Sequence, residues 1–250
     1  MSRIKNKKNL KSFDERANYN VTFDGDIPES VNWVEKNVVS PVDELFLCAA
    51  GWAFAAAGAI ESRHAINTGS DLVRLSPQQC VDCAREMGEN WDNCDGGDTD
   101  DCMFYGQIDP LNTYADFPYI HDMQSCKEEA TKGPATVTEV NHVMYKSQKD
   151  LMAAIAQQPI IVMVDSAEDP FRFYHGGVIT EGCGSATDEF LLAVGYGTAE
   201  DGTPYYLAKH NLGLDWGEDG YVRIANTDEK GWGVCGIQSN PMYPETKPTE

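Results

Sequence analysis

The 250-residue sequence predicts an α+β protein with a helical first half and a β-rich second half. The first observation is a mostly apolar run from Leu45 to Ile60, followed by a second helical signal at Pro77. The second is a change of pattern near Ala135, after which short runs of β-branched and aromatic residues recur between Gly, Asp and Pro. Helices and strands segregated in this way indicate two subdomains.

The apolar run predicts a buried helix over about residues 52–67. Thr68 and Gly69 are expected to end it, because glycine commonly follows the last turn of a helix. A membrane span needs about 20 apolar residues, whereas this run is shorter and rich in alanine and glycine. We therefore expect a core helix and no membrane span.

Two further helices are predicted in the first half. Ser76, Pro77 and Gln79 are typical of a helix start, as a serine cap, a proline in the first turn and a capping-box glutamine. This helix is expected over residues 77–87. A short helix is expected from Cys102 to Tyr105.

The second half predicts one helix, over residues 147–157, among short strands. The strands are expected at residues 135–145, 159–166, 190–197, 204–211 and 221–226. We accordingly divide the chain into a flexible amino-terminal arm or propeptide remnant (1–26), a helical domain (27–142) and a β-rich domain (143–250).

The charge balance restricts the partners. Forty acidic residues oppose 19 basic residues, which gives a net charge of −21. Because nucleic acids and anionic lipids bind through Lys and Arg, we exclude nucleic-acid function.

Eight cysteines in one chain indicate disulfides and an oxidising compartment. Cys80 and Cys83 form a C-x-x-C pair, but no second pair or finger-like histidine spacing supports a zinc site. The first residues lack the apolar segment of a secretory leader. We still expect a vacuolar or extracellular protein, and Asn20 is a candidate glycosylation site in the triplet Asn-Val-Thr.

Several sequence blocks, taken in order, resemble the papain-like cysteine proteases. They are "IPESVNW", "CAAGWAF", "NCDGG", "FYHGGVI", "LLAVGYG", "DWGEDGYVRI" and "GVCGI", spread over residues 27–244. The resemblance implies a papain-like two-domain fold, with a helical left domain, a β-barrel-like right domain and a cleft between them.

The same resemblance implies that the catalytic residues are replaced. The family uses a cysteine at a helix start, a histidine base, an orienting asparagine and an oxyanion glutamine. At the matching positions this chain has Gly51, Glu189, His210 and Leu45 respectively. Leu212 stands where the family has the tryptophan that shields the asparagine.

With a glycine at the nucleophile position, the chain resembles a group of papain-like seed proteins, the soybean oil-body-associated thiol-protease homologues and vacuolar allergens. This similarity implies an inactive pseudoprotease, acting in seed storage or defence, or binding peptides or small ligands. The alternative is a papain-like endopeptidase with weak or atypical activity. The vestigial cleft should be lined by Gly96, Gly97, Asp188, Phe190 and Leu212. We expect a monomer that needs no cofactor.

The resemblance also implies the disulfides Cys48–Cys94, Cys83–Cys126 and Cys183–Cys235. For Cys80 and Cys102 two hypotheses remain, a fourth bridge or two buried free thiols.

Two clusters that contain acidic residues raise the question of a metal site. Asp188, Glu189 and His210 could hold a divalent cation, but an ion pair between Glu189 and His210 is the favoured interpretation. The run "CDGGDTDDC" lacks calcium-loop spacing and predicts a solvated acidic loop. No metal is therefore expected.

Overall fold

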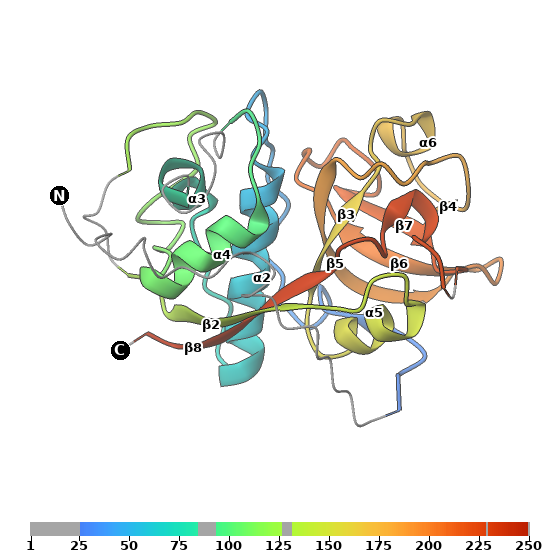
Figure 1. The fold of residues 1–250 in the computed structure, drawn as a ribbon, viewed down its shortest axis with the longest axis horizontal. Helices are drawn as coiled ribbons and strands as arrows, with labels where there is room; N and C mark the ends of the chain where they lie inside the picture. Colours follow the sequence, from blue (N-terminus) through green and yellow to red (C-terminus); the bar gives the residue numbers. More distant parts are fainter. Residues whose placement is uncertain (1–25, 85–93, 127–131, 229, 250) are drawn as a thin grey trace.

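The computed structural model describes residues 26–84, 94–126, 132–228 and 230–249. The helices between residues 51 and 108 gather in one half of the molecule, and most of the sheet lies in the other half together with the helices between residues 148 and 172 (Figure 1). The α+β prediction is confirmed. Asn20, the end of the helix predicted over residues 77–87, and most of the arm lie outside the described residues.

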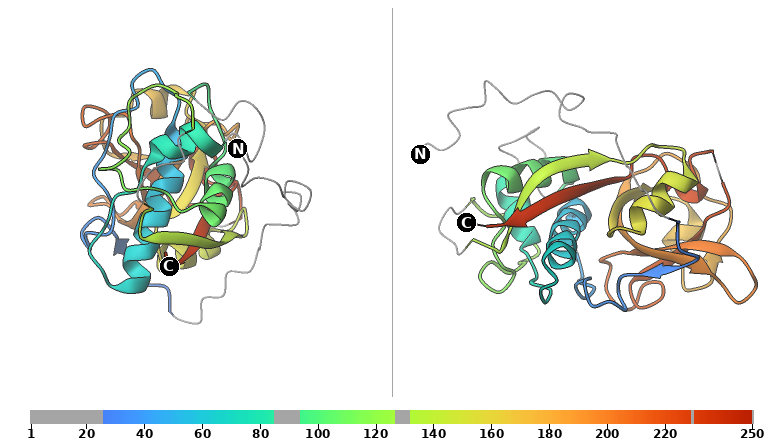
Figure 2. Two further views of the ribbon diagram at one scale, coloured as in Figure 1. Left: turned by 90° about the vertical axis from the view of Figure 1, so that its left-hand side faces the viewer. Right: turned by 90° about the horizontal axis from the view of Figure 1, so that it is seen from below.

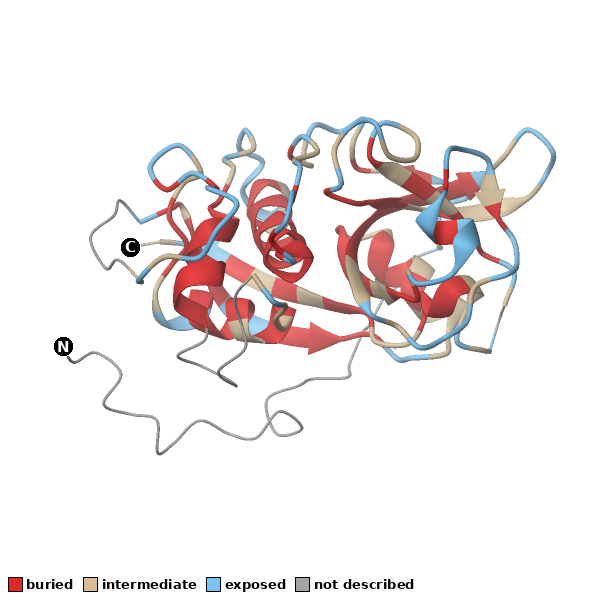
Figure 3. Ribbon diagram, turned by 90° about the horizontal axis from the view of Figure 1, so that it is seen from above, coloured by how far each residue is buried: buried red, intermediate tan, exposed pale blue. Residues whose placement is uncertain are grey.

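Helix α2 (Gly51–Thr68) is the centre of the helical half. Fourteen of its 18 residues are buried, so nearly every face packs against protein, as the red α2 in Figure 3 illustrates. Its small Ala and Gly side chains allow close approach on all sides. It ends at Gly69, whose φ of 63° suits glycine and whose N–H donates to the Ala65 carbonyl.

Two shorter helices cover α2. Helix α3 (Pro77–Cys83) starts as predicted, with the Ser76 hydroxyl accepting a hydrogen bond from the Gln79 N–H. Helix α4 (Thr99–Ile108) is longer than the predicted 102–105 segment, because Asp98 caps it three residues earlier by accepting from the Asp100 N–H.

In the described part of the chain the sheet has eight strands, and its main path runs β2-β8-β3-β5-β6-β7-β4, with β1 paired to β5. All pairings are antiparallel except that of β4 with β7. The strands are β1 (Val31–Asn32), β2 (Ala135–His142), β3 (Ile160–Val164), β4 (Val178–Ile179), β5 (Glu189–Thr198), β6 (Pro204–Lys209), β7 (Tyr221–Ala225) and β8 (Met242–Pro248). Helices α5 (Gln148–Ile155) and α6 (Asp169–Arg172) and the 3₁₀ turn Val234–Gly236 complete the fold.

Chain segments cross between the two halves at both ends. Strand β1 pairs with β5, and Val31 and Trp33 belong to the core of the β-rich half. Strand β8 pairs with β2 and runs alongside the helices (Figure 2), and its Met242 belongs to the core around α2. The domain boundary after residue 142 therefore stays a prediction, and both of these strand pairings cross it.

Four disulfides connect the eight cysteines. Three are the bridges Cys48–Cys94, Cys83–Cys126 and Cys183–Cys235. The fourth joins Cys80 on α3 to Cys102 on α4, so the hypothesis of two free thiols is wrong. Among the described residues, no helix has the length and apolar character needed to cross a membrane.

Candidate functional site

The site is built around the first residue of α2, Gly51. The loop before it is held by the Cys48–Cys94 disulfide and by a 2.9 Å hydrogen bond from the Ala49 N–H to the Cys94 carbonyl. Ala50 precedes the helix without a side-chain cap, and the first turn contains no acidic residue. The amino terminus of an 18-residue helix carries partial positive charge, so this end of α2 favours an anion.

The Glu189 carboxylate lies at this helix start. Glu189 is the first residue of β5, one of the strands that pack against α2. A Cβ atom added to Gly51 would lie 2.2 Å from Glu189 Oε1, well inside contact distance. Glu189 therefore occupies the space that a side chain at position 51 would need.

His210 lies beside Glu189, directly after β6. Its Nε2 is 3.8 Å from Glu189 Oε1, so the structure brings together the two residues of the favoured ion-pair interpretation. The imidazole is 3% exposed, and neither ring nitrogen has a hydrogen bond to any residue that the structure describes. Trp216 contacts it edge-on at 4.8 Å and Phe171 lies 5.7 Å away, between ring centroids. Sequence reasoning missed both aromatic neighbours, although Trp216 lies in a quoted block.

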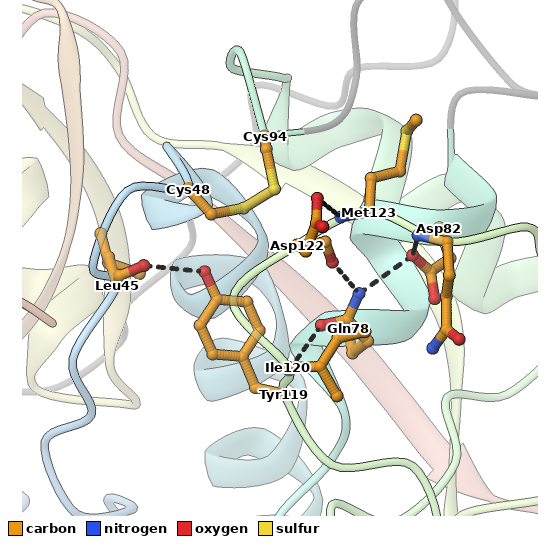
Figure 4. The surroundings of a disulfide bond; sticks show 10 residues. Leu45, Cys48, Gln78, Asp82, Cys94, Tyr119, Ile120, Asp122 and Met123 are labelled. Atoms are coloured by element: carbon orange, nitrogen blue, oxygen red, sulfur yellow. Dashed lines mark hydrogen bonds between the residues drawn. A yellow bond between two sulfur atoms is a disulfide. The ribbon is translucent and has the colours of Figure 1, made fainter.

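The side chain of Leu45, the fourth predicted position, lies outside the site. It is 4% exposed and belongs to the core around α2. Its backbone N–H donates to the Asn211 carbonyl at 3.0 Å, and its carbonyl accepts from the Tyr119 hydroxyl at 3.2 Å (Figure 4). Leu45 thus ties this loop to the residue after His210 through the backbone alone.

Two pockets meet at Glu189. The first, here called the acidic pocket, has a volume of about 380 Å³. It is lined by Ala49, Gly51, Trp52, Asp95, Gly96, Gly97, Asp98, Met163, Asp188, Glu189, Phe190 and Asn240. The second, here called the histidine pocket, has a volume of about 340 Å³. It is lined by Ser166, Ala167, Phe171, Arg172, Glu189, His210, Leu212 and Trp216.

The five residues predicted to border the cleft all line one of these pockets. Gly96, Gly97, Asp188 and Phe190 line the acidic pocket, and Leu212 lines the histidine pocket. Gly97 packs its backbone on an aromatic ring, because a Cβ there would lie 2.3 Å from Trp52 Cε2.

The acidic run is only partly solvated, so that expectation was wrong for Asp100, which is buried, whereas Asp98 is half-buried. Burial raises the pKa of Asp98, which caps α4. Asp100 is 2% exposed, and its Oδ1 lies 3.8 Å from the buried His142 Nε2. The sequence could not place His142, on β2, beside the first turn of α4, some 40 residues earlier. Among the described residues, no group of three or more His, Cys, Asp or Glu side chains is arranged to hold a metal ion.

Comparison with known proteins decides the family. Residues 27–245 match the sequence model described as papain family cysteine protease. The chain belongs to this family. Mexicain from Jacaratia mexicana is 36% identical over 219 residues, which cover 87% of this chain and 97% of mexicain. The senescence-specific cysteine protease SAG39 of rice is 37% identical over 90% of this chain.

Solved papain-family structures agree in fold. The bromelain protease of Ananas comosus, solved with the E64 inhibitor, gives a TM-score of 0.81 at 31% identity, over 87% of this chain and 99% of that one. A recombinant stem bromelain precursor gives 0.84 at 32% identity, over 92% and 75%. The two-domain papain-like fold is therefore shown. The chain spans slightly less than two thirds of SAG39, at 65% of its length.

Proposed function

We propose that this papain-family chain is catalytically inactive and binds peptides or small ligands in its cleft. The observation that carries the proposal is the replacement of a nucleophile by Gly51 together with the Glu189 carboxylate that fills the adjacent space. A cysteine protease needs a thiolate, and glycine supplies no reactive atom.

The state of the cysteines supports the same conclusion. All eight are disulfide-bonded, so the folded chain contains no free thiol to replace the missing one. Cys48 is three residues from Gly51, but its sulfur is bonded to Cys94. His210 could act as a base only on a nucleophile that position 51 does not provide.

Ligand binding does not require the lost chemistry. A peptide can add to the exposed edge of a loop through backbone hydrogen bonds, with side chains entering flanking pockets. Gly96 and Gly97 border the acidic pocket, and Leu212 borders the histidine pocket. An extended peptide passing Glu189 would reach both.

The biological setting is part of the proposal. Four disulfides suit a secretory, vacuolar or extracellular protein. Together with the glycine at position 51, they support a storage or defence protein of the seed-protein group, and we further propose that it is a monomer and an allergen. One solved relative, Amb a 11, is a ragweed pollen allergen. Glycosylation at Asn20 remains a prediction.

The alternative, a weak or atypical endopeptidase, is tested directly. The purified chain is incubated with fluorogenic peptides at acidic and neutral pH, with and without a thiol-reactive epoxide. We expect no turnover above buffer. Turnover that the epoxide blocks would establish the endopeptidase instead.

A gain-of-function variant tests the positions. Gly51→Cys, Glu189→His, His210→Asn and Leu45→Gln are combined in one chain, and peptide hydrolysis is measured. Hydrolysis that appears only in the fourfold variant would support the assignment of each position. Gly51→Cys alone should stay inactive, because Glu189 occupies the space that the cysteine side chain needs and position 189 lacks the family's catalytic histidine.

A further inference from the structure

Two aromatic side chains project into solvent from adjoining loops of the β-rich half. Tyr145 follows β2 and is 51% exposed, and Trp232 comes just before the 3₁₀ turn and is 43% exposed. Their rings are nearly parallel, at 21°, with centroids 6.3 Å apart. Neither residue lines the acidic pocket or the histidine pocket. The ring pair is therefore an exposed aromatic surface separate from the site at Gly51.

One buried glutamine, Gln238, ties the two loops together. Its N–H donates to the Trp232 carbonyl at 2.8 Å, and its carbonyl accepts from the Lys146 N–H at 2.9 Å. Its side-chain nitrogen donates to two more carbonyls of the Trp232 loop, at 2.9 and 3.0 Å, and its Oε1 accepts from the Tyr206 hydroxyl at 3.1 Å. Because these bonds fix both loops, a ligand finds the ring pair already formed and loses little affinity to ordering it.

The ring pair already holds a cation. Nζ of Lys146 lies 3.7 Å from the Trp232 ring centroid and 6.0 Å from that of Tyr145, within the range of a cation–π interaction. Lys146 has a φ of 57°, a left-handed conformation that is uncommon for residues other than glycine. No carboxylate of the described residues forms an ion pair with it. In the described part of the chain, the rings are thus the partner of this ammonium group.

A second pair of lysine and tryptophan shows what distinguishes this one. Nζ of Lys36 lies 3.9 Å from the Trp33 ring centroid. The Trp33 side chain is nearly buried, at 7% exposed, and its indole N–H donates to a backbone carbonyl at 2.7 Å. Trp33 therefore offers little surface to a ligand. Trp232 combines open indole surface, a parallel second ring and an ammonium group that is bound only weakly, because an exposed cation–π contact is a weak one.

We propose that the ring pair of Tyr145 and Trp232 binds a quaternary ammonium group, such as that of choline, and that Lys146 occupies the site when no ligand is bound. A trimethylammonium group has no N–H, so it gives up less hydration than a lysine ammonium when it leaves water for an aromatic surface. The net charge of −21 also draws cations toward the protein. A ligand of this class displaces Lys146 from the indole and breaks only one exposed contact.

The test follows the indole N–H resonances of the isotope-labelled, disulfide-intact chain by NMR. The resonance of Trp232 is identified by its absence in Trp232→Leu. Choline is compared with dimethylbutanol, its uncharged carbon analogue of the same shape, at constant ionic strength. We expect choline to shift the Trp232 resonance saturably, and the alcohol to bind about fivefold more weakly. The resonance of the nearly buried Trp33 should stay in place in the same spectra.

Three variants locate the effect. Lys146→Met removes the internal competitor and should tighten choline binding about threefold. Lys149→Met removes an equal charge from an exposed lysine three residues further along the chain, and should leave the affinity unchanged. Tyr145→Leu removes one of the two rings and should weaken choline binding about threefold. An unmoved Trp33 resonance shows in each case that the variant is folded.

The outcomes decide the cation site and the role of Lys146 separately. Equal binding of choline and its uncharged analogue would overturn the cation site, and so would a Trp232 resonance that choline leaves in place in both the wild type and Lys146→Met. If Lys149→Met tightens binding as much as Lys146→Met does, the effect is one of general charge and the role given to Lys146 fails. Because the rings lie outside both cleft pockets, none of these results bears on the proposed function of the cleft.

Discussion

Gly51 and Glu189 depend on each other sterically. The carboxylate can stand at the start of α2 only because position 51 has no Cβ, and a Cβ at position 51 fits only if Glu189 moves. The helix terminus in turn favours the negative charge. Neither residue can be interpreted alone, although the sequence presents them 138 positions apart.

A double-mutant cycle measures this dependence. Gly51→Ala in the wild-type chain should lower the free energy of unfolding by about 1 kcal/mol, because the new methyl group meets the carboxylate. In the Glu189→Ala background the same change should be neutral or stabilising by up to about 1 kcal/mol, since alanine is the better helix former. Urea unfolding of the four chains gives the coupling energy. Additive effects would show that the two side chains do not share this space.

Some features of the site can be identified from the order of sequence motifs, whereas others depend on how distant segments pack together. Gly51, Glu189, His210 and Leu45 were found because sequence blocks occur in family order. The contact between Gly51 and Glu189 was not, because it depends on how β5 packs against α2. The pair of Asp100 with His142 was missed for the same reason, and no local pattern joins α4 to β2.

The predictability of the secondary structure follows the strength of the local signal. Helix α2 and strand β3 have long apolar runs, and α3 and α5 have serine caps, so all four were predicted. Strands β1 and β4 have two residues each, too few for any periodicity.

Strand β8 was missed because it contains Pro244 and Pro248, which argue against a central strand. The register explains why they are tolerated. The described pairing of β8 with β3 involves only Met242, so beyond that residue β8 has a ladder partner on one side, β2. At a position where the backbone N–H would point to the open side, proline removes no hydrogen bond of the ladder.

The Cys80–Cys102 bridge connects α3 to α4 and yields a prediction about their stability. It closes a loop with a sequence separation of 22, for which the chain-entropy model gives about 3 kcal/mol. Replacing both cysteines with alanine should lower the free energy of unfolding by about that amount, measured with denaturant. In the wild-type chain, a thiol assay in denaturant without reductant should detect no free thiol. Two free thiols would rule out this bridge.

The two halves of the molecule meet over a buried charged pair. Glu61 on α2 is 3% exposed and accepts a 2.8 Å hydrogen bond from the Leu75 N–H. Lys209 at the end of β6 is 4% exposed and donates to the Ser40 carbonyl and hydroxyl at 2.8 and 3.1 Å. Burial raises the pKa of Glu61, and the positive charge of Lys209 opposes that rise. The negative charge of Glu61 in turn opposes the lowering of the Lys209 pKa, so each charge helps to stabilise the other together with these hydrogen bonds.

Removing one member should cost more than removing both. Lys209→Met leaves Glu61 buried without this cation and should lower the free energy of unfolding by about 3 kcal/mol at pH 7. Adding Glu61→Gln, which keeps an oxygen for the Leu75 N–H, should recover most of that loss. A double variant less stable than Lys209→Met alone would contradict this account of the pair.

The pair also predicts a pH dependence of the whole fold. Burial lowers the pKa of Lys209 from 10.5 to about 8. Between these values the unfolded chain binds more protons at this group than the folded chain does, so its contribution to stability rises with pH. From pH 8 to 9.5 the gain is about 1.5 kcal/mol. Tyr196, Tyr221 and Tyr243, which are buried or half-buried, have pKa values raised by burial and act in the opposite direction only near and above pH 10. Denaturant unfolding of the wild type and of Lys209→Met, compared at each pH over this window, should show a difference that grows with pH. A constant difference would mean that Lys209 titrates in the folded chain as it does in the unfolded chain.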